Sequence, residues 1–332
     1  MREQNTCPVC SGAHLENLHS LKLVDRYPEP EAQIQRSNSY HRNWLLFEKI
    51  LKRSTDVVEI EFCFCATCGL IFFSPRPTEA DLAVKYQDVS ERGDTLVRER
   101  RRRVVDQRAL RATHIRATLE PHWRKVTGRA LDVGGADGHC LGELTSTFDC
   151  GLLDYESRDL WSGVRRLGNS LEDLGDAELF DVILCCHTLE HVPDIPPFLA
   201  GLVDHLANEG LLYVEVPLGC TGEIYATGNI LTHLNFFSEG SLGFVLEQAG
   251  LRVVDAACRP VLGSQSYQSA VVAMARKHTD PPPGDYLRDG ASITRKRMVR
   301  HIGPAVNRAN AKLVLSHPLL YALAFLRRLL RR

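Results

Sequence analysis

The second half of the chain alternates short apolar runs with stretches of helical periodicity. PPFLAGLVDHLANEG (196–210) fits a helix that ends at Gly210, and SEGSLGFVLEQAG (238–250) fits a helix with Ser238 as N-cap and Gly250 as its stop. Strands that alternate with helices are typical of a mostly parallel sheet flanked by helices. The sequence therefore predicts an α/β domain, with strands over 129–133, 150–154, 181–185, 211–216, 251–257 and 269–275.

The first third of the chain has weaker and more varied patterns. VVEIEFCF (57–64) alternates apolar and polar side chains and predicts a strand, whereas WLLFEKIL (44–51) predicts a helix. SPRPTEADLAVKY (74–86) predicts a turn followed by a short helix. Residues 96–120 predict one long helix with an apolar side, made of Leu96, Val97, Val104, Val105, Leu110, Ile115 and Leu119.

These patterns divide the chain into four segments. We expect a small N-terminal module over 1–90, followed by a linking basic helix over 91–125. The α/β domain covers 126–278. PPPGDYLRDG (281–290) reads as a linker, so that residues 279–332 form a linker and an amphipathic helical tail.

Composition and charge narrow the class of protein. The chain has 332 residues, of which 44% are apolar, and this is enough for a substantial core. A net charge of −1 and a pI near 6.9 argue against a surface built as a whole for nucleic acid. No apolar run reaches the length of a bilayer-spanning helix, and MREQNTCPVC lacks the apolar region of a secretory signal. We therefore expect a cytoplasmic protein.

Four of the eleven cysteines stand in two C-x-x-C pairs. Cys7-Pro-Val-Cys10 and Cys65-Ala-Thr-Cys68 each offer two thiolates on a tight turn, and together they predict a tetrahedral Zn²⁺ site. Four thiolates leave no open coordination position, so the role of the metal would be structural. Cys63 competes with Cys65 as a ligand, and unrelated buried thiols or a redox pair are the alternatives to a metal site.

LDVGGADGHC (131–140) predicts a strand, a glycine-rich bend and a following helix. Gly134, Gly135 and Gly138 would let a ligand approach the backbone closely, as in nucleotide-binding βαβ units. Asp132, at the end of the strand, would repel the pyrophosphate that a dinucleotide places at the helix N-terminus. S-adenosylmethionine has no phosphate, and its cationic end suits a carboxylate. We therefore expect S-adenosylmethionine rather than NAD as the cofactor.

Further cofactor contacts are expected where later strands end. Asp154 ends the second strand of the domain, where an acid would bind ribose hydroxyls, although a solvent-exposed turn residue is the alternative. Ser170 and Leu171, within NSLEDL, would lie along the adenine. HTLEHV (187–192) follows the next strand, at the carboxyl edge of the sheet where ligands of open α/β folds collect.

Several of these stretches resemble a known family. LDVGGADGHCL, LFDVILCCHTLEHVPD, LANEGLLYVEVP and HLNFFSEGSLGFVLEQAGL look like successive motifs of class I S-adenosylmethionine-dependent methyltransferases. The leading CPVC and CATCGLIFFSPRPTEADLAVKY are similar to the zinc-binding domain that precedes some of these enzymes, notably sugar C-methyltransferases acting on nucleotide-linked deoxysugars. The resemblance implies a Rossmann-like methyltransferase domain, a structural zinc module and a sugar-like small-molecule acceptor.

The sequence departs from that family at two places. The central glycine of the first motif is Ala136, a small change that should still permit cofactor binding. A Glu-His pair of the sugar C-methyltransferases falls in a segment that resembles ILTHLNFF, and here the pair reads Thr232-His233. Membership in the broader zinc-domain methyltransferase group is therefore favoured over carbon methylation in particular.

Proton removal from an acceptor needs a base that titrates near neutral pH, which a histidine provides. His233 is the leading candidate for this base, and its alternative role is to brace the loop before the 238–250 helix. His191 and Glu190 are further catalytic candidates that could instead shape the pocket wall. His187 should lie near the methionine portion of the cofactor.

Three functions follow from these observations. The favoured one is a methyltransferase that acts on a sugar or another small polar metabolite, with nucleic acid an unlikely partner. The second is an RNA methyltransferase in which the zinc module and Arg100–Arg103 bind phosphates, although such an arginine block is usually a solvated helix face. The third is a degenerate protein that binds the cofactor or a partner without turnover.

HPLLYALAFLRRLLRR (317–332) joins an apolar run to a basic end. The run is too short to span a bilayer, but it could form an interfacial helix on anionic lipid at the inner membrane surface. The alternative is a terminal helix that packs on the domain or on a second subunit.

Overall fold

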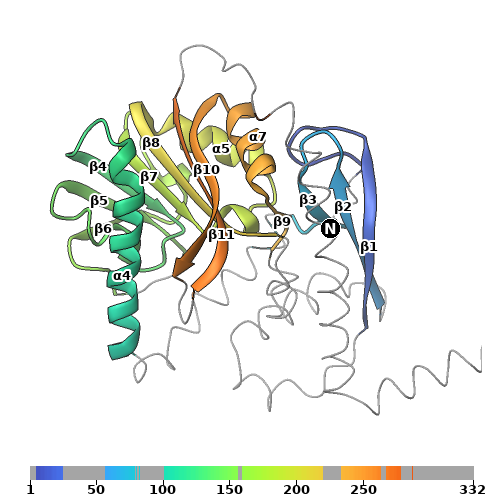
Figure 1. The fold of residues 1–332 in the computed structure, drawn as a ribbon, viewed down its shortest axis with the longest axis horizontal. Coiled ribbons are helices and arrows are strands. Elements are labelled where there is room, and N and C mark those ends of the chain that lie inside the picture. Colours follow the sequence, from blue (N-terminus) through green and yellow to red (C-terminus); the bar gives the residue numbers. More distant parts are fainter. Residues whose placement is uncertain are drawn as a thin grey trace, which may run out of the picture.

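The structure is a computed structural model that describes two β-sheets and the helices around the larger one (Figure 1). The predicted helix 44–51, most of 74–86, and the tail 317–332 lie outside the described residues, as does 281–290 apart from Tyr286. In the part of the chain that is described, no helix has the length and apolar character needed to cross a bilayer. The described residues are 5–24, 57–78, 80, 82, 101–155, 159–219, 233–262, 267–277 and 286.

The larger sheet has, within the described residues, seven strands in the order β10-β11-β8-β7-β4-β5-β6. Only β11 runs antiparallel to its neighbours, which confirms the predicted mostly parallel α/β sheet. The chain runs outward from β4 through β5 to β6 and then returns to β7, on the other side of β4. Ligands of open α/β sheets bind outside the carboxyl ends of the strands at such a reversal, here β4 and β7. The strands are β4 (Gly128–Val133), β5 (Phe148–Leu153), β6 (Val164–Gly168), β7 (Phe180–Cys186), β8 (Leu206–Pro217), β10 (Leu251–Leu262) and β11 (Tyr267–Lys277).

Alternate side chains of the strands form two separate apolar layers. Leu131 and Ile183 pack in one buried cluster with α5 (Ile195–Asp204) and α7 (Glu239–Gln248). Ala130 and Val182, one residue earlier on the same strands, pack in the other with Ile115 of α4 (Arg101–Leu119). Side chains alternate between the faces of a strand, so helices cover both faces of the sheet.

Within the α/β domain, the sequence prediction was wrong about the end of one helix and missed one strand of the larger sheet; in the smaller sheet, described below, it predicted β2 but not β1, β3 or β9. The predicted helix 196–210 ends at Asp204, and β8 starts at Leu206, which pairs with Phe180 of β7 and is fully buried. Gly210 therefore lies within β8 rather than at a helix stop. β6 was not predicted because VRRLG has no apolar run; of its five residues, only Val164 is buried.

Helix α4 confirms the described part of the predicted helix 96–120 and ends in a short 3₁₀ turn, η3 (Glu120–His122). Ile115 and Leu119 are buried as expected, but Leu110 is 44% exposed. After the glycine bend, the predicted helix is only a single 3₁₀ turn, η4 (His139–Leu141).

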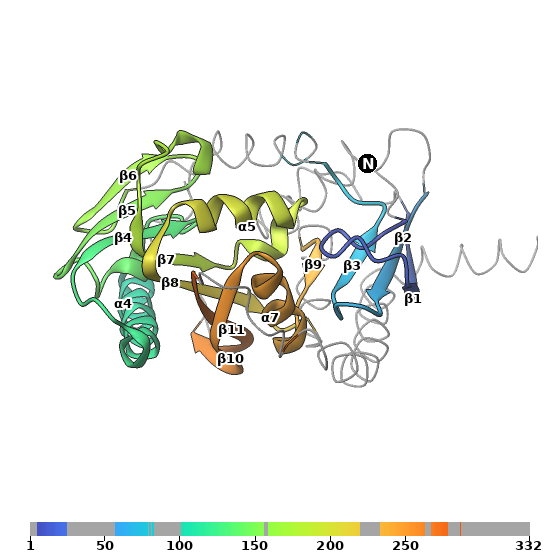
Figure 2. The same cartoon turned by 90° about the horizontal axis from the view of Figure 1, so that it is seen from above.

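The smaller sheet joins the N-terminal segment to the α/β domain. Its described strands are β1 (Leu15–Val24), β2 (Val57–Cys65), β3 (Ile71–Ser74) and β9 (Asn235–Phe236), all antiparallel to their neighbours. The first three lie to one side of the α/β domain, and β9 is the strand of this smaller sheet nearest to that domain (Figure 2). Ile71 of β3 pairs with Phe236 and Phe72 pairs with Asn235. A segment from the second half of the chain thus completes a sheet that begins near the N-terminus.

Helix α7 begins at the predicted N-cap. The Ser238 hydroxyl accepts a hydrogen bond from the Ser241 backbone N–H at 3.1 Å, and the Ser241 hydroxyl accepts one from the Ser238 N–H at 2.9 Å. Gly250, with φ of +82°, follows the helix in the left-handed conformation that glycine favours. The predicted start and stop of this helix are therefore confirmed.

Replacing Ser238 by alanine should lower the free energy of unfolding by about 1 kcal/mol, because the Ser241 backbone N–H at the start of α7 loses its hydrogen-bond acceptor. Urea unfolding monitored by circular dichroism measures this difference. Ser146→Ala, at an exposed serine, is the matched control and should change it by less than about 0.5 kcal/mol. Equal effects of the two variants would contradict the capping role.

Candidate functional site

The glycine bend follows β4 at the point where the sheet order reverses. Gly134 and Gly138 both have φ of +76°, a left-handed conformation that explains the need for glycine. A Cβ atom at Gly135 would lie 2.0 Å from an oxygen of the Asp132 carboxylate. The bend therefore passes directly over Asp132, and a side chain at position 135 would collide with the carboxylate.

Asp132 is fully buried at the end of β4. Neither of its carboxylate oxygens has a hydrogen-bond partner among the residues that the structure describes. Burial raises the pKa of this carboxyl well above its usual range, and the nearby Cys140 raises it further. A buried carboxylate without a partner is unfavourable, so the site suits a ligand that brings a positive charge or N–H donors.

Asp154 lies immediately after β5, beside the same bend. Its Oδ2 atom accepts a hydrogen bond from the Ala136 backbone N–H at 2.7 Å. Ala136 takes the left-handed conformation with φ of 57°, which an L-residue adopts at some cost. The Asp154 carboxylate therefore holds the bend in place and is 9% exposed, rather than being the solvent-exposed turn residue of the alternative interpretation.

Ser170 and Leu171 follow β6, next to Asp154. The Asp154 N–H donates to the Gly168 carbonyl at 3.2 Å, which fixes the ends of β5 and β6 side by side. Ser170 is the N-cap of η5 (Leu171–Asp173), and its N–H donates to Asp173 Oδ2 at 3.1 Å. The predicted ribose and adenine contacts thus lie on neighbouring strand ends.

His187 lies between two buried glutamates at the end of β7. Its Nε2 is 2.9 Å from Glu215 Oε1, and its Nδ1 is 3.4 Å from Glu190 Oε1. Burial opposes the charged imidazolium, but the contacts with Glu190 and Glu215 outweigh it and raise the pKa of His187 to about 10. His187 is therefore a fixed cation at neutral pH and is not suited to accept a proton.

Glu215 anchors this network from β8, and the sequence analysis missed it. Its carboxylate accepts hydrogen bonds from Arg111 at 2.6 Å and from the Tyr213 hydroxyl at 2.9 Å. Burial alone would raise the pKa of Glu215, but His187 and Arg111 lower it to about 2. A glutamate within the apolar strand LLYVEVP is the signal that could have identified it; Arg111 stands in a charged helix and has no such signal.

The three predicted catalytic residues lie together. Glu190 and His191 belong to η6 (Leu189–His191), and His233 lies two residues before β9. The His191 and His233 rings meet edge to face with centroids 4.8 Å apart, and His191 Nε2 lies 3.7 Å from Glu190 Oε1. The charges of His191 and His187 overcome burial and lower the pKa of Glu190 to about 2. The structure therefore brings together residues that are 42 positions apart.

Glu190, His191 and His233 each offer one possible metal-ligand atom, and these atoms lie within 4.8 Å of one another. The cationic His187 already pairs with Glu190. A metal ion at this cluster would therefore compete with His187 for the Glu190 carboxylate.

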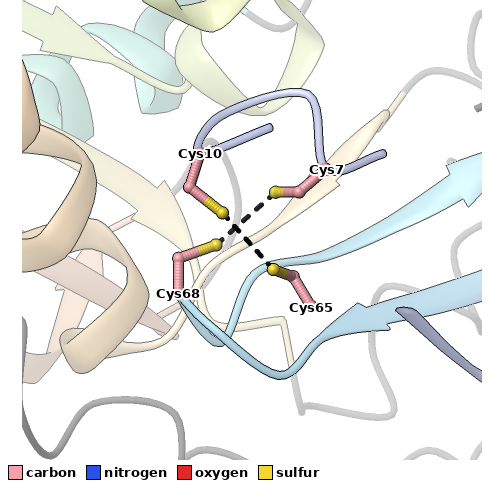
Figure 3. A group of neighbouring side chains, drawn as sticks. All are labelled: Cys7, Cys10, Cys65 and Cys68. Atoms are coloured by element: carbon pink, nitrogen blue, oxygen red, sulfur yellow. Dashed lines mark hydrogen bonds between the residues drawn. The ribbon is translucent and has the colours of Figure 1, made fainter. Parts of the chain in front are cut away.

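The two C-x-x-C pairs meet in the N-terminal module (Figure 3). Cys7 Sγ lies 3.5 Å from Cys68 Sγ, and Cys10 Sγ lies 3.5 Å from Cys65 Sγ. Four thiolates around one zinc ion at Zn–S distances near 2.3 Å lie about 3.8 Å apart, and these two distances are close to that value. Cys63 lies on β2 and does not belong to this group of four.

Residues 97–256 match a family model described as a methyltransferase domain. Its range covers the glycine bend, the ends of β5 and β7, and the η6 residues. Residues 97–256 are identified as a methyltransferase domain. Asp132 and Asp154 lie at the carboxyl ends of β4 and β5, two neighbouring parallel strands of this domain.

Relatives of the methyltransferase domain match only part of the chain. The C-methyltransferase NovU of Streptomyces niveus is 35% identical over 31% of this chain and 25% of its own length. A ubiquinone biosynthesis O-methyltransferase of Rickettsia typhi is 23% identical over 37% of this chain and 54% of its own length. A solved 1,6-didemethyltoxoflavin-N1-methyltransferase of Burkholderia thailandensis covers 61% of this chain and 92% of its own, with 18% identity and a TM-score of 0.47. This chain therefore spans a quarter to about half of these two curated relatives.

Proposed function

We propose that this protein transfers a methyl group from S-adenosylmethionine to a small polar acceptor, and that the acceptor is a nucleotide-linked sugar. The observation that carries the proposal is the buried, unpartnered Asp132 carboxylate beneath the glycine bend. It suits the cationic end of this cofactor and would repel a diphosphate.

The other strand ends supply the remaining contacts in this proposal. The Asp154 carboxylate, held by Ala136, is placed to accept hydrogen bonds from ribose hydroxyls. Ser170 and Leu171 on the neighbouring strand end would lie along the adenine. His187, fixed as a cation, would lie near the methionine carboxylate.

S-adenosylmethionine supplies a methyl group on a sulfonium, whose S–C bond breaks with both electrons returning to sulfur as the acceptor–methyl bond forms. The chain must align the acceptor and remove its proton. His233 is the proposed recipient of that proton, and it lies beside His191 and Glu190.

The sugar acceptor rests on two lines of support. The motifs CPVC and CATCGLIFFSPRP resemble the module that precedes sugar C-methyltransferases. One of the matched relatives is itself a C-methyltransferase. We further propose that Cys7, Cys10, Cys65 and Cys68 hold a structural Zn²⁺ that stabilises this module.

The proposed function is tested with tritium-labelled S-adenosylmethionine and purified, zinc-loaded protein. Label should pass to a nucleotide-linked deoxysugar in a mixed panel and not to total RNA. Transfer to RNA alone, with strongly salt-dependent binding, would establish an RNA methyltransferase instead. Binding of S-adenosylhomocysteine without transfer to either class would favour the non-catalytic alternative.

Replacing His233 by asparagine should lower kcat about 100-fold, because the amide cannot take up the acceptor's proton. The dissociation constant for S-adenosylhomocysteine should stay the same, because Asp132 and Asp154 are unchanged. His114→Asn, on the exposed side of α4, is the matched control with full activity. A His233→Asn variant with wild-type kcat would reassign the base.

A further inference from the structure

Arg76 is a buried guanidinium that reaches from the N-terminal module into the methyltransferase domain. It lies two residues after β3 and is 2% exposed. Its Nη1 donates to the Leu234 carbonyl at 3.1 Å, and its Nη2 donates to Asn235 Oδ1 at 2.8 Å and to the Pro193 carbonyl at 3.1 Å. The hydrogen-bond acceptors of this side chain thus come from two segments of the other domain.

Those two segments carry the candidate proton-transfer residues. Leu234 directly follows His233, and Pro193 lies two residues after His191. The Leu234 N–H also donates to the Glu190 carbonyl at 2.7 Å. Arg76 therefore bonds to the backbone just beyond each histidine.

Asn235 continues the same connection. Its Nδ2 donates to the Leu189 carbonyl at 3.2 Å and to the Val192 carbonyl at 2.8 Å. These two carbonyls flank Glu190 and His191 in the chain. Arg76 orients the Asn235 amide by donating to its oxygen, which leaves the amide nitrogen to hold the η6 segment.

Arg76 carries a buried charge, and this makes the positions of its hydrogen-bond acceptors important. No carboxylate contacts the guanidinium among the described residues; backbone carbonyls and one amide take its protons. Burial lowers the pKa of Arg76 to about 10, so the side chain remains charged at neutral pH. A buried charge is tolerated only where its hydrogen-bonding partners are well placed, and the planar fork of arginine requires those partners at fixed positions.

We infer that Arg76 is a positioning residue for methyl transfer, which sets the spacing of His191 and His233 from the N-terminal module. The N-terminal module then contributes to the acceptor site, in addition to its proposed role in holding a structural metal ion. This inference rests on the proposed function for its chemical meaning, but the spacing can be measured without any acceptor.

The test measures the nuclear Overhauser effect between the His191 and His233 rings in full-length, zinc-loaded protein with ¹³C-labelled histidine. Wild-type protein should show the cross-peak, because the ring centroids are 4.8 Å apart. Arg76→Met should lose it while keeping the wild-type dissociation constant for S-adenosylhomocysteine. Arg76→Lys, which keeps the charge without the fork, should retain a weakened cross-peak.

Arg129→Met is the matched control. Arg129 also bonds a neighbouring segment, through Glu178 at 2.7 Å, and stacks on Phe180, but it lies near the amino end of β4. This variant should keep the full cross-peak. A persistent cross-peak in folded Arg76→Met, or its loss in Arg129→Met, overturns the inference.

If Arg76→Met does not fold, the comparison of Arg76→Lys with Arg129→Lys decides the question. Equal, wild-type cross-peaks in both lysine variants would overturn the positioning role. Failure to methylate any acceptor would contradict the proposed function but would leave the ring contact and its dependence on Arg76 measurable, so the two failures are distinguishable.

Discussion

Asp132→Asn should abolish S-adenosylmethionine binding and, in the same variant, make the ligand-free protein more stable. The carboxylate is buried without a partner, so it is unfavourable until a cationic ligand occupies the site. Asparagine has nearly the same shape but no charge. We expect the affinity for S-adenosylhomocysteine to fall at least about 100-fold. This corresponds to a loss of about 2.8 kcal/mol of binding free energy, since each tenfold change in affinity is about 1.4 kcal/mol. Tm should rise by about 2–4 °C at neutral pH, for a gain near 1 kcal/mol.

The stability gain should depend on pH in a defined direction. The folded-state pKa of Asp132 is raised above that of the unfolded chain, so the unfolded state loses this proton first as pH rises. Any stability from the protonated carboxyl is therefore fully present below pH about 4 and is lost as pH rises through the folded-state pKa. The Tm difference between variant and wild type should accordingly be larger at pH 8 than at pH 5.

Calorimetric titration with S-adenosylhomocysteine and thermal unfolding at the two pH values make these measurements. Asp149→Asn is the control, because Asp149 is exposed and pairs with Arg165 at 2.6 Å on the surface of β5. That variant should bind normally. Affinity within threefold of wild type in Asp132→Asn would contradict the proposed role of the carboxylate in cofactor binding.

Cys68→Ser should release the metal and abolish methyl transfer while leaving S-adenosylhomocysteine binding intact. One of four thiolates is lost, and the binding energy of a structural zinc ion, about 10–16 kcal/mol in small zinc domains, is largely folding energy. The small sheet should then lose its order, and with it the β3–β9 pairing next to His233. Asp132 and the glycine bend lie on β4 of the other sheet and should be unaffected.

Elemental analysis for zinc and limited proteolysis of the N-terminal module check this outcome. Cys258→Ser, at an exposed cysteine on β10, is the control and should keep one zinc per chain. Cys63→Ser should also keep it, because Cys63 lies outside the group of four. If Cys68→Ser retained zinc and Cys63→Ser lost it, then Cys63 rather than Cys68 would be the fourth zinc ligand.

The central part of the fold could be predicted from the sequence because its signals are local. The apolar runs of β4, β7 and β11 are long enough to indicate buried strands, and Ser238 and Gly250 mark the ends of α7 by their own chemistry. The end of α5 could not be predicted, because LANEG has no strong preference and its fate depends on the pairing of Leu206 with β7. Tertiary pairing decided that segment.

The candidate site shows the same division. Asp132 and the glycines follow from spacing alone, because backbone geometry at the bend allows little else. His233 was predicted, but its contact with His191 depends on β9, a two-residue strand too short to leave a pattern. Glu215 and Arg111 were missed because their roles arise from a buried charge network between distant elements.

The pairing of β3 with β9 also bears on how such proteins diverge or can be engineered. Phe72 and Asn235 face each other across the strands, and Arg76 reaches over the same junction. If the cysteine-bearing modules of two methyltransferases were exchanged, acceptor preference would therefore change with the module only when residues 233–237 were exchanged as well. A chimera joined between the N-terminal module and the methyltransferase domain would pair β3 of one protein with β9 of the other, and the two strands would not be matched.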